Sequence, residues 1–234
     1  MISVQWFHIG VITLLNLIAI GTIHYLGRWL TRVEITRKLA HISSGLLGLL
    51  LPRFFPVYEA VWPMITLWIC FSGFLYFTYR RKLLSAINGI DRKTVGAYIM
   101  PTTLTSLWLF NRLLFQKTGH NEFVFYDLPL LVLTFGDSLA AFIGSKYGRR
   151  KIYPHSQKTW VGFVTILFVT FSISVFYLHF ISNTLTTSNH AEMQTIGVDI
   201  LIAISAAIAE AFSVRGWDNL TIPIGVFFVL TFIL

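Results

Sequence analysis

The sequence has few of the residues that build soluble or disulfide-stabilised proteins. Only 12% of its 234 residues are charged, and the single cysteine, Cys70, lies inside an apolar run. One cysteine excludes an internal disulfide and argues against a structural zinc site. The chain is 55% hydrophobic, with a mean hydropathy of +0.70. This composition indicates a polytopic membrane protein, and the length leads us to expect a single integral membrane domain over residues 1–234.

The signatures of several common catalytic sites are also absent. The chain has no G-x-x-x-x-G-K-[S/T] loop, no H-R-D or D-F-G motif, no H-E-x-x-H pair and no G-x-S-x-G turn. A P-loop enzyme and a protein kinase are therefore not supported. The first apolar segment begins almost at Met1 with no Lys or Arg before it, so we expect no cleavable signal peptide.

Eight apolar segments are long enough to cross, or nearly cross, a hydrocarbon layer of about 30 Å. They cover approximately residues 5–27, 39–54, 57–79, 94–113, 127–147, 159–182, 194–213 and 219–234. The second and the last segments are short, so seven spans are also possible. We therefore predict an all-α transmembrane helix bundle of about eight spans.

Basic residues are distributed unevenly between the two sides of this bundle. Fifteen of the eighteen Lys and Arg residues fall on one side, and only Arg53, Arg112 and Lys117 fall on the other. By the positive-inside rule the richer side is cytoplasmic, and both termini then face the outer side. Topology and an anionic small substrate account for the net charge of +8, so we expect no nucleic acid partner.

The first polar group reads E-x-x-R-K-x-x-H and comprises Glu34, Arg37, Lys38 and His41. On a helix these spacings place all four side chains on one face. Such a face could hold phosphate oxygens, with Glu34 orienting the cations. The alternative is a juxtamembrane basic helix that only sets topology, with His41 as a hydrogen-bonded core residue.

The second polar group surrounds Asp137, an acid inside the fifth apolar segment. A charge buried in hydrocarbon costs at least ~2.5 kcal/mol, so an intramembrane acid suggests function. Close helix packing explains the neighbouring small residues, such as Gly144 and Gly148, but does not explain the acid. Lys158 directly precedes the sixth segment, where the amides of a helix N-terminus also favour phosphate. These residues predict a site for a metal ion and a polyphosphate.

The remaining polar groups lie around the last two segments. Glu210 lies near the end of the seventh segment, and Asp218 and Asn219 follow in the next turn. Asp218 and Asn219 could simply cap the last helix. Alternatively, the acids serve Mg²⁺, which proteins hold through one or two carboxylates together with substrate phosphates. Phosphoryl transfer requires mainly positioning, charge neutralisation and a base, and these residues suit that task.

Three blocks of these residues resemble the signatures of the phytol kinase and dolichol kinase family. The blocks are E-x-x-R-K-x-x-H-x-x-x-G (Glu34 to Gly45), G-D-S-L-A-A-x-x-G-x-x-x-G (Gly136 to Gly148) with Lys158-Thr159, and Glu210 with D-N-L-T-I-P (Asp218 to Pro223). They occur in the family order and span most of the chain. The resemblance implies a CTP-dependent kinase that phosphorylates the hydroxyl of a long isoprenoid alcohol, such as phytol, geranylgeraniol, farnesol or a polyprenol.

When the family signatures are carried onto this chain, charge and placement suggest a role for each residue of the blocks. Asp137 is a metal ligand or the base, and Lys158 is the second catalytic residue. Mg²⁺ is held by Asp137, Glu210 and Asp218, and Glu34 supports the cations. The nucleotide, CTP as phosphoryl donor, is bound by Arg37, Lys38, His41, Gly144, Gly148, Arg149, Lys158 and Asn219.

The central block departs from the family pattern at two positions. Where the family often reads K-S-x-E-G-S, this chain reads K-T-W-V-G-F, so Val161 replaces an acid and Phe163 a serine. The same stretch resembles the phosphatidate cytidylyltransferases, so CTP-dependent nucleotidyl transfer to a lipid phosphate is an alternative. A transporter with Asp137 and Glu210 as intramembrane ion sites is a second one. One-sided clustering of the polar residues favours an enzyme at the cytoplasmic face of a cell or organelle membrane.

Overall fold

The computed structural model describes residues 2–29, 33–56, 60–81, 83–84, 96–115, 123–154, 156–181 and 191–233. Within these ranges the regular structure is helical, apart from one isolated β-bridge between Lys151 and Thr159. This confirms the all-α prediction. Lys117, which contributed to the predicted topology, lies outside the described residues.

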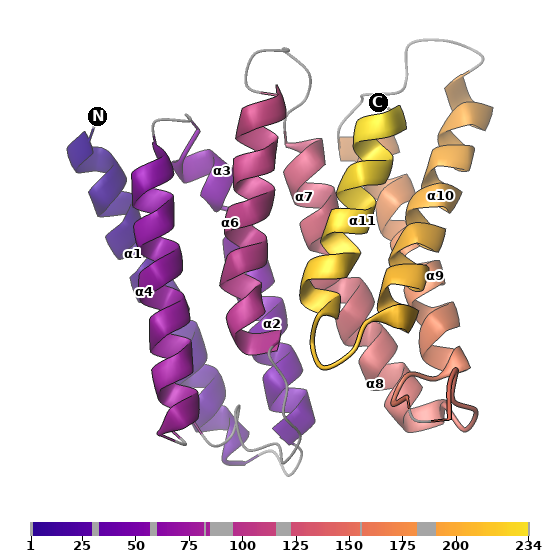
Figure 1. The fold of residues 1–234 in the computed structure, drawn as a ribbon, viewed down its shortest axis with the longest axis horizontal. Coiled ribbons are helices and arrows are strands. Elements are labelled where there is room, and N and C mark those ends of the chain that lie inside the picture. The colour runs from indigo at the N-terminus through magenta and orange to yellow at the C-terminus, as the bar shows by residue number, and fades with distance from the viewer. Residues whose placement is uncertain are drawn as a thin grey trace.

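The helices of the described ranges form eight successive passes that run up and down along one common axis (Figure 1). They are α1 (Ile2–Gly27), α2 (Val33–Gly48) with the short α3 (Leu51–Phe54), α4 (Val61–Arg80), α6 (Gly96–Phe115), the continuous run of α7 (Val124–Leu131), η2 (Val132–Asp137) and α8 (Ser138–Tyr147), α9 (Trp160–Phe176) with η3 (Tyr177–Ile181), α10 (Ala191–Phe212) and α11 (Asp218–Ile233). The start of α1 and the end of α11 lie at the same end of the bundle, as an even number of passes requires.

Within the described ranges, four helical runs are long and apolar enough to cross a membrane. They are Gln5–Gly27, Val61–Arg80, Val124–Tyr147 and Trp160–Ile181. The helix Asp218–Ile233 is apolar but shorter. The chain is therefore a helical membrane protein, while the full count of eight spans and the outward direction of the termini remain predictions.

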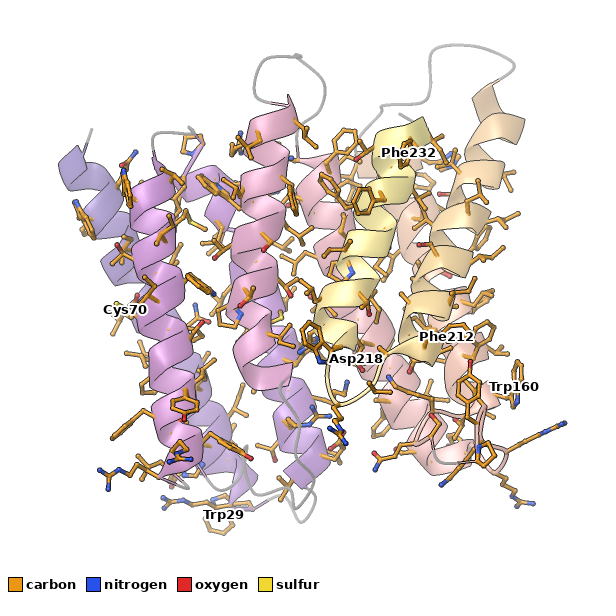
Figure 2. The ribbon with its side chains drawn as sticks, in the orientation of Figure 1. Trp29, Cys70, Trp160, Phe212, Asp218 and Phe232 are labelled. Atoms are coloured by element: carbon orange, nitrogen blue, oxygen red, sulfur yellow. The ribbon has the colours of Figure 1, made fainter. Side chains whose placement is uncertain are left out.

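The outside of the bundle is covered by large apolar side chains, which suits contact with lipid (Figure 2). Phe168 on α9 is 68% exposed and Phe232 on α11 is 85% exposed. Cys70 is likewise exposed, on α4. Trp29 lies exposed at the end of α1, near one end of the bundle, where interfacial tryptophans are expected.

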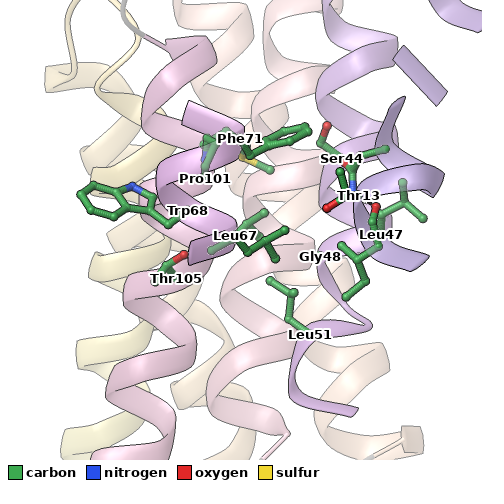
Figure 3. A pocket seen from close by; sticks show the side chains of 14 residues that line it. Thr13, Ser44, Leu47, Gly48, Leu51, Leu67, Trp68, Phe71, Pro101 and Thr105 are labelled. Carbon is green, nitrogen blue, oxygen red and sulfur yellow. Dashed lines mark hydrogen bonds between the residues drawn. The ribbon is translucent and has the colours of Figure 1, made fainter. Parts of the chain in front are cut away.

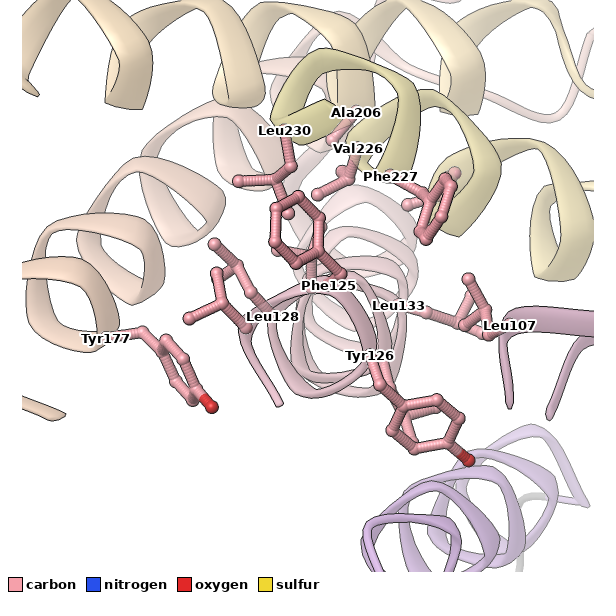
Figure 4. Packing of buried hydrophobic residues seen from close by; sticks show 14 of the residues in the cluster. Leu107, Phe125, Tyr126, Leu128, Leu133, Tyr177, Ala206, Val226, Phe227 and Leu230 are labelled. Carbon is pink, nitrogen blue, oxygen red and sulfur yellow. The ribbon is translucent and has the colours of Figure 1, made fainter. Parts of the chain in front are cut away.

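Among the four candidate membrane spans of the described residues, the run that begins with α7 and η2 has the largest buried share. Val124 to Leu130 are all buried, and Phe125 packs against Phe227 of α11 (Figure 4). Helices α2, α6, α9 and α11 contact this run. The segment η2 is a π-helix, whose wider turn is often found at functional sites. The run thus holds Asp137, its last π-helical residue, inside the bundle.

Candidate active site

The motif that begins at Glu34 forms the first turns of α2, as its spacing predicts. Arg37 donates from Nη2 to Glu34 Oε1 at 2.6 Å and from Nε to Oε2 at 3.3 Å. This two-point pairing holds the guanidinium at the end of the bundle. The next two motif residues, Lys38 and His41, point into the bundle instead, toward Asp137.

Asp137 is only 3% exposed and is bound by α2. Lys38 donates from Nζ to Asp137 Oδ2 at 2.5 Å, and His41 Nε2 lies 3.7 Å from the same oxygen. His41 Nε2 also lies 3.4 Å from the carbonyl oxygen of Leu133, inside the π-helical segment. Gly45 lets α2 approach this closely, because a Cβ there would lie 2.1 Å from Thr134 Oγ1. The first and second sequence blocks therefore meet at one carboxylate.

Lys158 joins the second and third sequence blocks. Its Nζ donates to Asp218 Oδ2 and to Glu210 Oε1, both at 2.8 Å. Burial by itself would lower the pKa of Lys158, but the carboxylates of Asp218 and Glu210 outweigh it and raise the pKa above its usual value. The ammonium therefore stays charged at any physiological pH.

The two carboxylate oxygens of Glu210 differ in their hydrogen bonding. Its Oε1 is bound by Lys158, whereas Oε2 is buried with no hydrogen-bond partner among the described residues. The hydroxyl of Ser138, next to Asp137 in sequence, is buried without a described partner as well. Buried polar atoms are normally paired, so an orphaned carboxylate oxygen indicates room for a cation or a donor.

The charges of this cluster nearly balance without a ligand. Four carboxylates, those of Glu34, Asp137, Glu210 and Asp218, face three permanent cations, Arg37, Lys38 and Lys158. In the described part of the chain, no three His, Cys, Asp or Glu side chains gather closely enough to hold a metal ion. The residues nevertheless fit Mg²⁺, because Mg²⁺ takes one or two protein carboxylates and fills its shell with phosphates and water.

Gly144 and Gly148 allow α8 to touch the start of α9. A Cβ on Gly148 would lie 2.3 Å from Thr159 Oγ1, and a Cβ on Gly144 would lie 2.9 Å from the same atom. Thr159 caps α9, accepting the amide of Gly162 at 3.2 Å. These glycines thereby position Lys158, the neighbour of Thr159; their contact with a nucleotide remains a prediction.

Two further residues predicted to bind the nucleotide differ in their exposure: Asn219 is buried and Arg149 is exposed. Asn219 is buried and ties α11 to α6, since its amide donates to the carbonyl oxygen of Gly96 at 2.7 Å. The backbone carbonyl oxygen of Asn219 accepts a hydrogen bond from the hydroxyl of Thr103 at 2.8 Å. Arg149 is exposed on the loop after α8, and the ion pairs found among the described residues do not include it. A nucleotide role for either residue remains a prediction.

A second buried acid, Asp127, belongs to no motif considered above. It accepts Arg53 Nη2 at 2.6 Å, Arg53 Nη1 at 3.0 Å and the hydroxyl of Tyr177 at 3.0 Å. The sequence did contain a signal for this pair, because Arg53 is one of very few basic residues assigned to the outer side. A third acid, Asp199, is buried against Ser174 and His179. Buried polar residues therefore occur at both ends of the bundle, not only at the end with Lys158.

Comparison with known proteins places this chain in a family. The profile of the cytidylyltransferase family matches residues 1–229, so the chain belongs to that family. The chain is similar to the phytol kinase of Synechocystis sp., with 26% identity over 210 residues that cover 84% of this chain and 78% of the relative. No solved structure shows a significant match.

Two eukaryotic relatives extend this comparison. The CTP-dependent diacylglycerol kinase 1 of Saccharomyces cerevisiae is 27% identical over 216 residues, covering 86% of this chain and 73% of the relative. The chloroplastic phytol kinase 1 of Arabidopsis thaliana is 24% identical over 212 residues, covering 82% of this chain and 64% of the relative. The match thus spans less than two thirds of the Arabidopsis protein.

Proposed function

We propose that this chain is a CTP-dependent lipid kinase that phosphorylates the hydroxyl of a long-chain isoprenoid alcohol at the cytoplasmic membrane face. The observation that carries the proposal is the cluster around Asp137 and Lys158. Residues from three separate blocks converge there on buried carboxylates and ammonium groups. The relatives named phytol kinase and CTP-dependent diacylglycerol kinase support the same chemistry.

The cations of the cluster would bind the triphosphate by exchanging partners. Lys38 and Lys158 are each held by carboxylates in the ligand-free arrangement. Phosphate oxygens offer the same charge-assisted hydrogen bonds, so an ammonium group can turn from a carboxylate to a phosphate at modest cost. Arg37, at the mouth of the cluster, adds a planar guanidinium suited to two phosphate oxygens.

Glu210 and Asp218 are the pair best placed to hold Mg²⁺, with Asp137 as a third carboxylate nearby. Both bond the same ammonium nitrogen, so their oxygens lie close together, and Glu210 Oε2 has no competing partner among the described residues. When bound, Mg²⁺ would neutralise charge on the β- and γ-phosphates. Lys158 bonds both carboxylates in the ligand-free arrangement, and its ammonium would pair with an oxygen of the γ-phosphate.

Asp137 is the residue we assign to the reacting hydroxyl. Its carboxylate accepts the hydroxyl proton while the lipid oxygen forms a bond to the γ-phosphorus. The bond between the γ-phosphorus and its bridging oxygen breaks, and CDP leaves with that oxygen. His41 orients the carboxylate, and Lys38 holds it in place until the triphosphate binds. The lipid phosphate stays in the bilayer, with its tail among the helices.

The proposal is tested with purified protein in detergent, Mg²⁺, CTP labelled at the γ-phosphate and a panel of isoprenoid alcohols. Label in an organic-extractable product supports the kinase and identifies the substrate. A diacylglycerol sample belongs in the panel because one relative carries that name. Transfer to diacylglycerol alone would support the kinase activity but show that its substrate is diacylglycerol rather than an isoprenoid alcohol.

Nucleotidyl transfer is the second candidate, because the family to which the chain belongs is named for it. In that reaction a lipid phosphate attacks the α-phosphorus and pyrophosphate leaves. CTP labelled at the α-phosphate, incubated with phosphatidate, distinguishes the two reactions. Label that enters the lipid from the α-position, with none transferred from the γ-position, would establish this second function instead.

A further inference from the structure

A pocket between α1, α2, α4 and α6 lies outside the charged cluster. It is partly open to the surroundings. Apolar side chains dominate its walls, as Figure 3 shows for Leu47, Leu51 and Leu67. A few hydroxyl groups interrupt them, including those of Ser44 and Thr105. Such a lining, mostly apolar with a few polar groups, is typical of a site for an apolar molecule.

Two walls of the pocket lead directly to the charged cluster. Helix α2 carries Lys38 and His41 at the cluster and Ser44 in the pocket, so six residues, or about 9 Å along the helix, separate Lys38 from Ser44. Helix α6 begins at Gly96, which is bound by Asn219, and Met100 lines the pocket about 6 Å further along. Measured along these two helices, the pocket therefore lies within about 10 Å of the end of the bundle that holds the cations.

We infer that this pocket holds the hydrocarbon chain of the lipid alcohol, as a single prenyl chain, with its hydroxyl end directed toward Asp137. The inference rests on the proposed function. It follows from the join between an apolar slot and an adjacent charged cluster, which matches a molecule with a long apolar tail and one reacting hydroxyl.

The shape of the pocket also accounts for a glycine and a proline in its walls. Gly48 lets the side chain of Leu104 approach α2, because a Cβ there would lie 2.6 Å from Leu104 Cδ2. Pro101 lies inside α6 and lines the pocket. A proline within a helix removes one backbone hydrogen bond and widens the turn. Both residues shape the slot beside the chain rather than contact the cations.

The first test is a chain-length series of prenyl alcohols with five, ten, fifteen and twenty carbons. Each methylene that enters an apolar site contributes about fourfold to binding, so kcat/KM should rise steeply with length until the slot is full. Ser44→Phe, which fills the slot, should abolish this rise and lower kcat/KM for the longest alcohol by at least about tenfold. The loss should be smaller for the five-carbon alcohol, which occupies less of the slot, and the KM for CTP should change little.

Leu46→Phe is the matched control, because Leu46 lies two residues further along α2 and is exposed. It should preserve the rise with chain length. A kcat/KM that is independent of chain length in the wild-type kinase would overturn the inference and leave the proposed function standing. Equal effects of Ser44→Phe on the shortest and longest alcohols would also overturn it.

A second test needs no turnover and no variant. A twenty-carbon prenyl alcohol with a photoreactive group at its far end is irradiated with the wild-type protein, and labelled peptides are identified by mass spectrometry. Label on pocket residues of α2, α4 or α6, displaced by unlabelled alcohol, supports the pocket even if no phosphate is transferred. Label confined to the outer, lipid-facing residues, or displaced by diacylglycerol but not by prenyl alcohol, would overturn the inference.

Discussion

Asp127 and Asp137 lie in the same continuous helical run, ten residues or about 15 Å apart, and both are buried. Asp127 is bound by the two terminal nitrogens of the Arg53 guanidinium and by the phenol hydroxyl of Tyr177. Asp137 has one ammonium partner at bonding distance, and the imidazole of His41 lies further off. Burial of an acid is thus a poor indicator of function by itself, whereas partners that can be exchanged are a better one.

The surroundings of the two acids differ in the same way. Asp127 pairs with Arg53, and the guanidinium of Arg53 lies over the ring of Phe123, 4.9 Å from the ring centre. Asp137 belongs to a cluster with one more carboxylate than permanent cations and with an unpaired oxygen on Glu210. The first arrangement stabilises the fold, and the second leaves charge available for a ligand.

The largest difference is expected when Asp137 becomes neutral. Asp137→Asn keeps the shape of the side chain but removes the proton acceptor, so phosphoryl transfer should fall by at least about a thousandfold. Transfer of label from γ-labelled CTP measures this directly. The variant also leaves the largely buried ammonium of Lys38 without its carboxylate partner, so the melting temperature in detergent should fall and activity is compared per folded molecule. Activity within about tenfold of the wild type would remove Asp137 from the active site.

Lys158 offers the next largest effect. Lys158→Met removes the cation that faces the triphosphate, and kcat/KM for CTP should fall by about a hundredfold. Lys158→Arg retains the charge and should recover part of that loss. If both variants lose activity equally, geometry rather than charge is the requirement at this position. Nucleotide binding measured by calorimetry separates weakened binding from slowed transfer.

Asp127→Asn should show the opposite pattern. It breaks a buried pair, and because the side chain of Arg53 is 43% exposed its charge is partly solvated, so we expect a loss of about 2 kcal/mol, below the range for fully buried pairs. Denaturant titration in mixed micelles measures the loss. Activity per folded molecule should remain near that of the wild type, and a large fall in kcat without destabilisation would break the comparison between the two acids.

The smallest effect is expected at Tyr177, which donates to Asp127 from η3. Tyr177→Phe removes one hydrogen bond but leaves the Arg53 pair, so the loss of stability should be about 1 kcal/mol. Combined with Asp127→Asn, it should add little, because both changes act on the same contact. A fully additive double variant would show that Tyr177 stabilises the bundle through some other contact.

Several parts of the site were predictable because they depend on local spacing. The interval between Glu34 and His41 predicts a helix that carries all four residues, and α2 is that helix. Asp137 stood out because an acid in an apolar segment is costly. Asp127 is an acid in the same segment, yet its partners come from 74 and 50 residues away, and no local pattern indicates them.

The sequence alone determined that the chain is a helical membrane protein, because hydropathy and the distribution of charge act over single segments. It also singled out the acids and cations of the cluster. Only the tertiary structure decided which cation meets which acid: Lys38 reaches Asp137 across 99 residues, and Lys158 reaches Asp218 across 60. Such pairings depend on how helices pack, through contacts such as Gly45 with Thr134 that lie between segments distant in sequence.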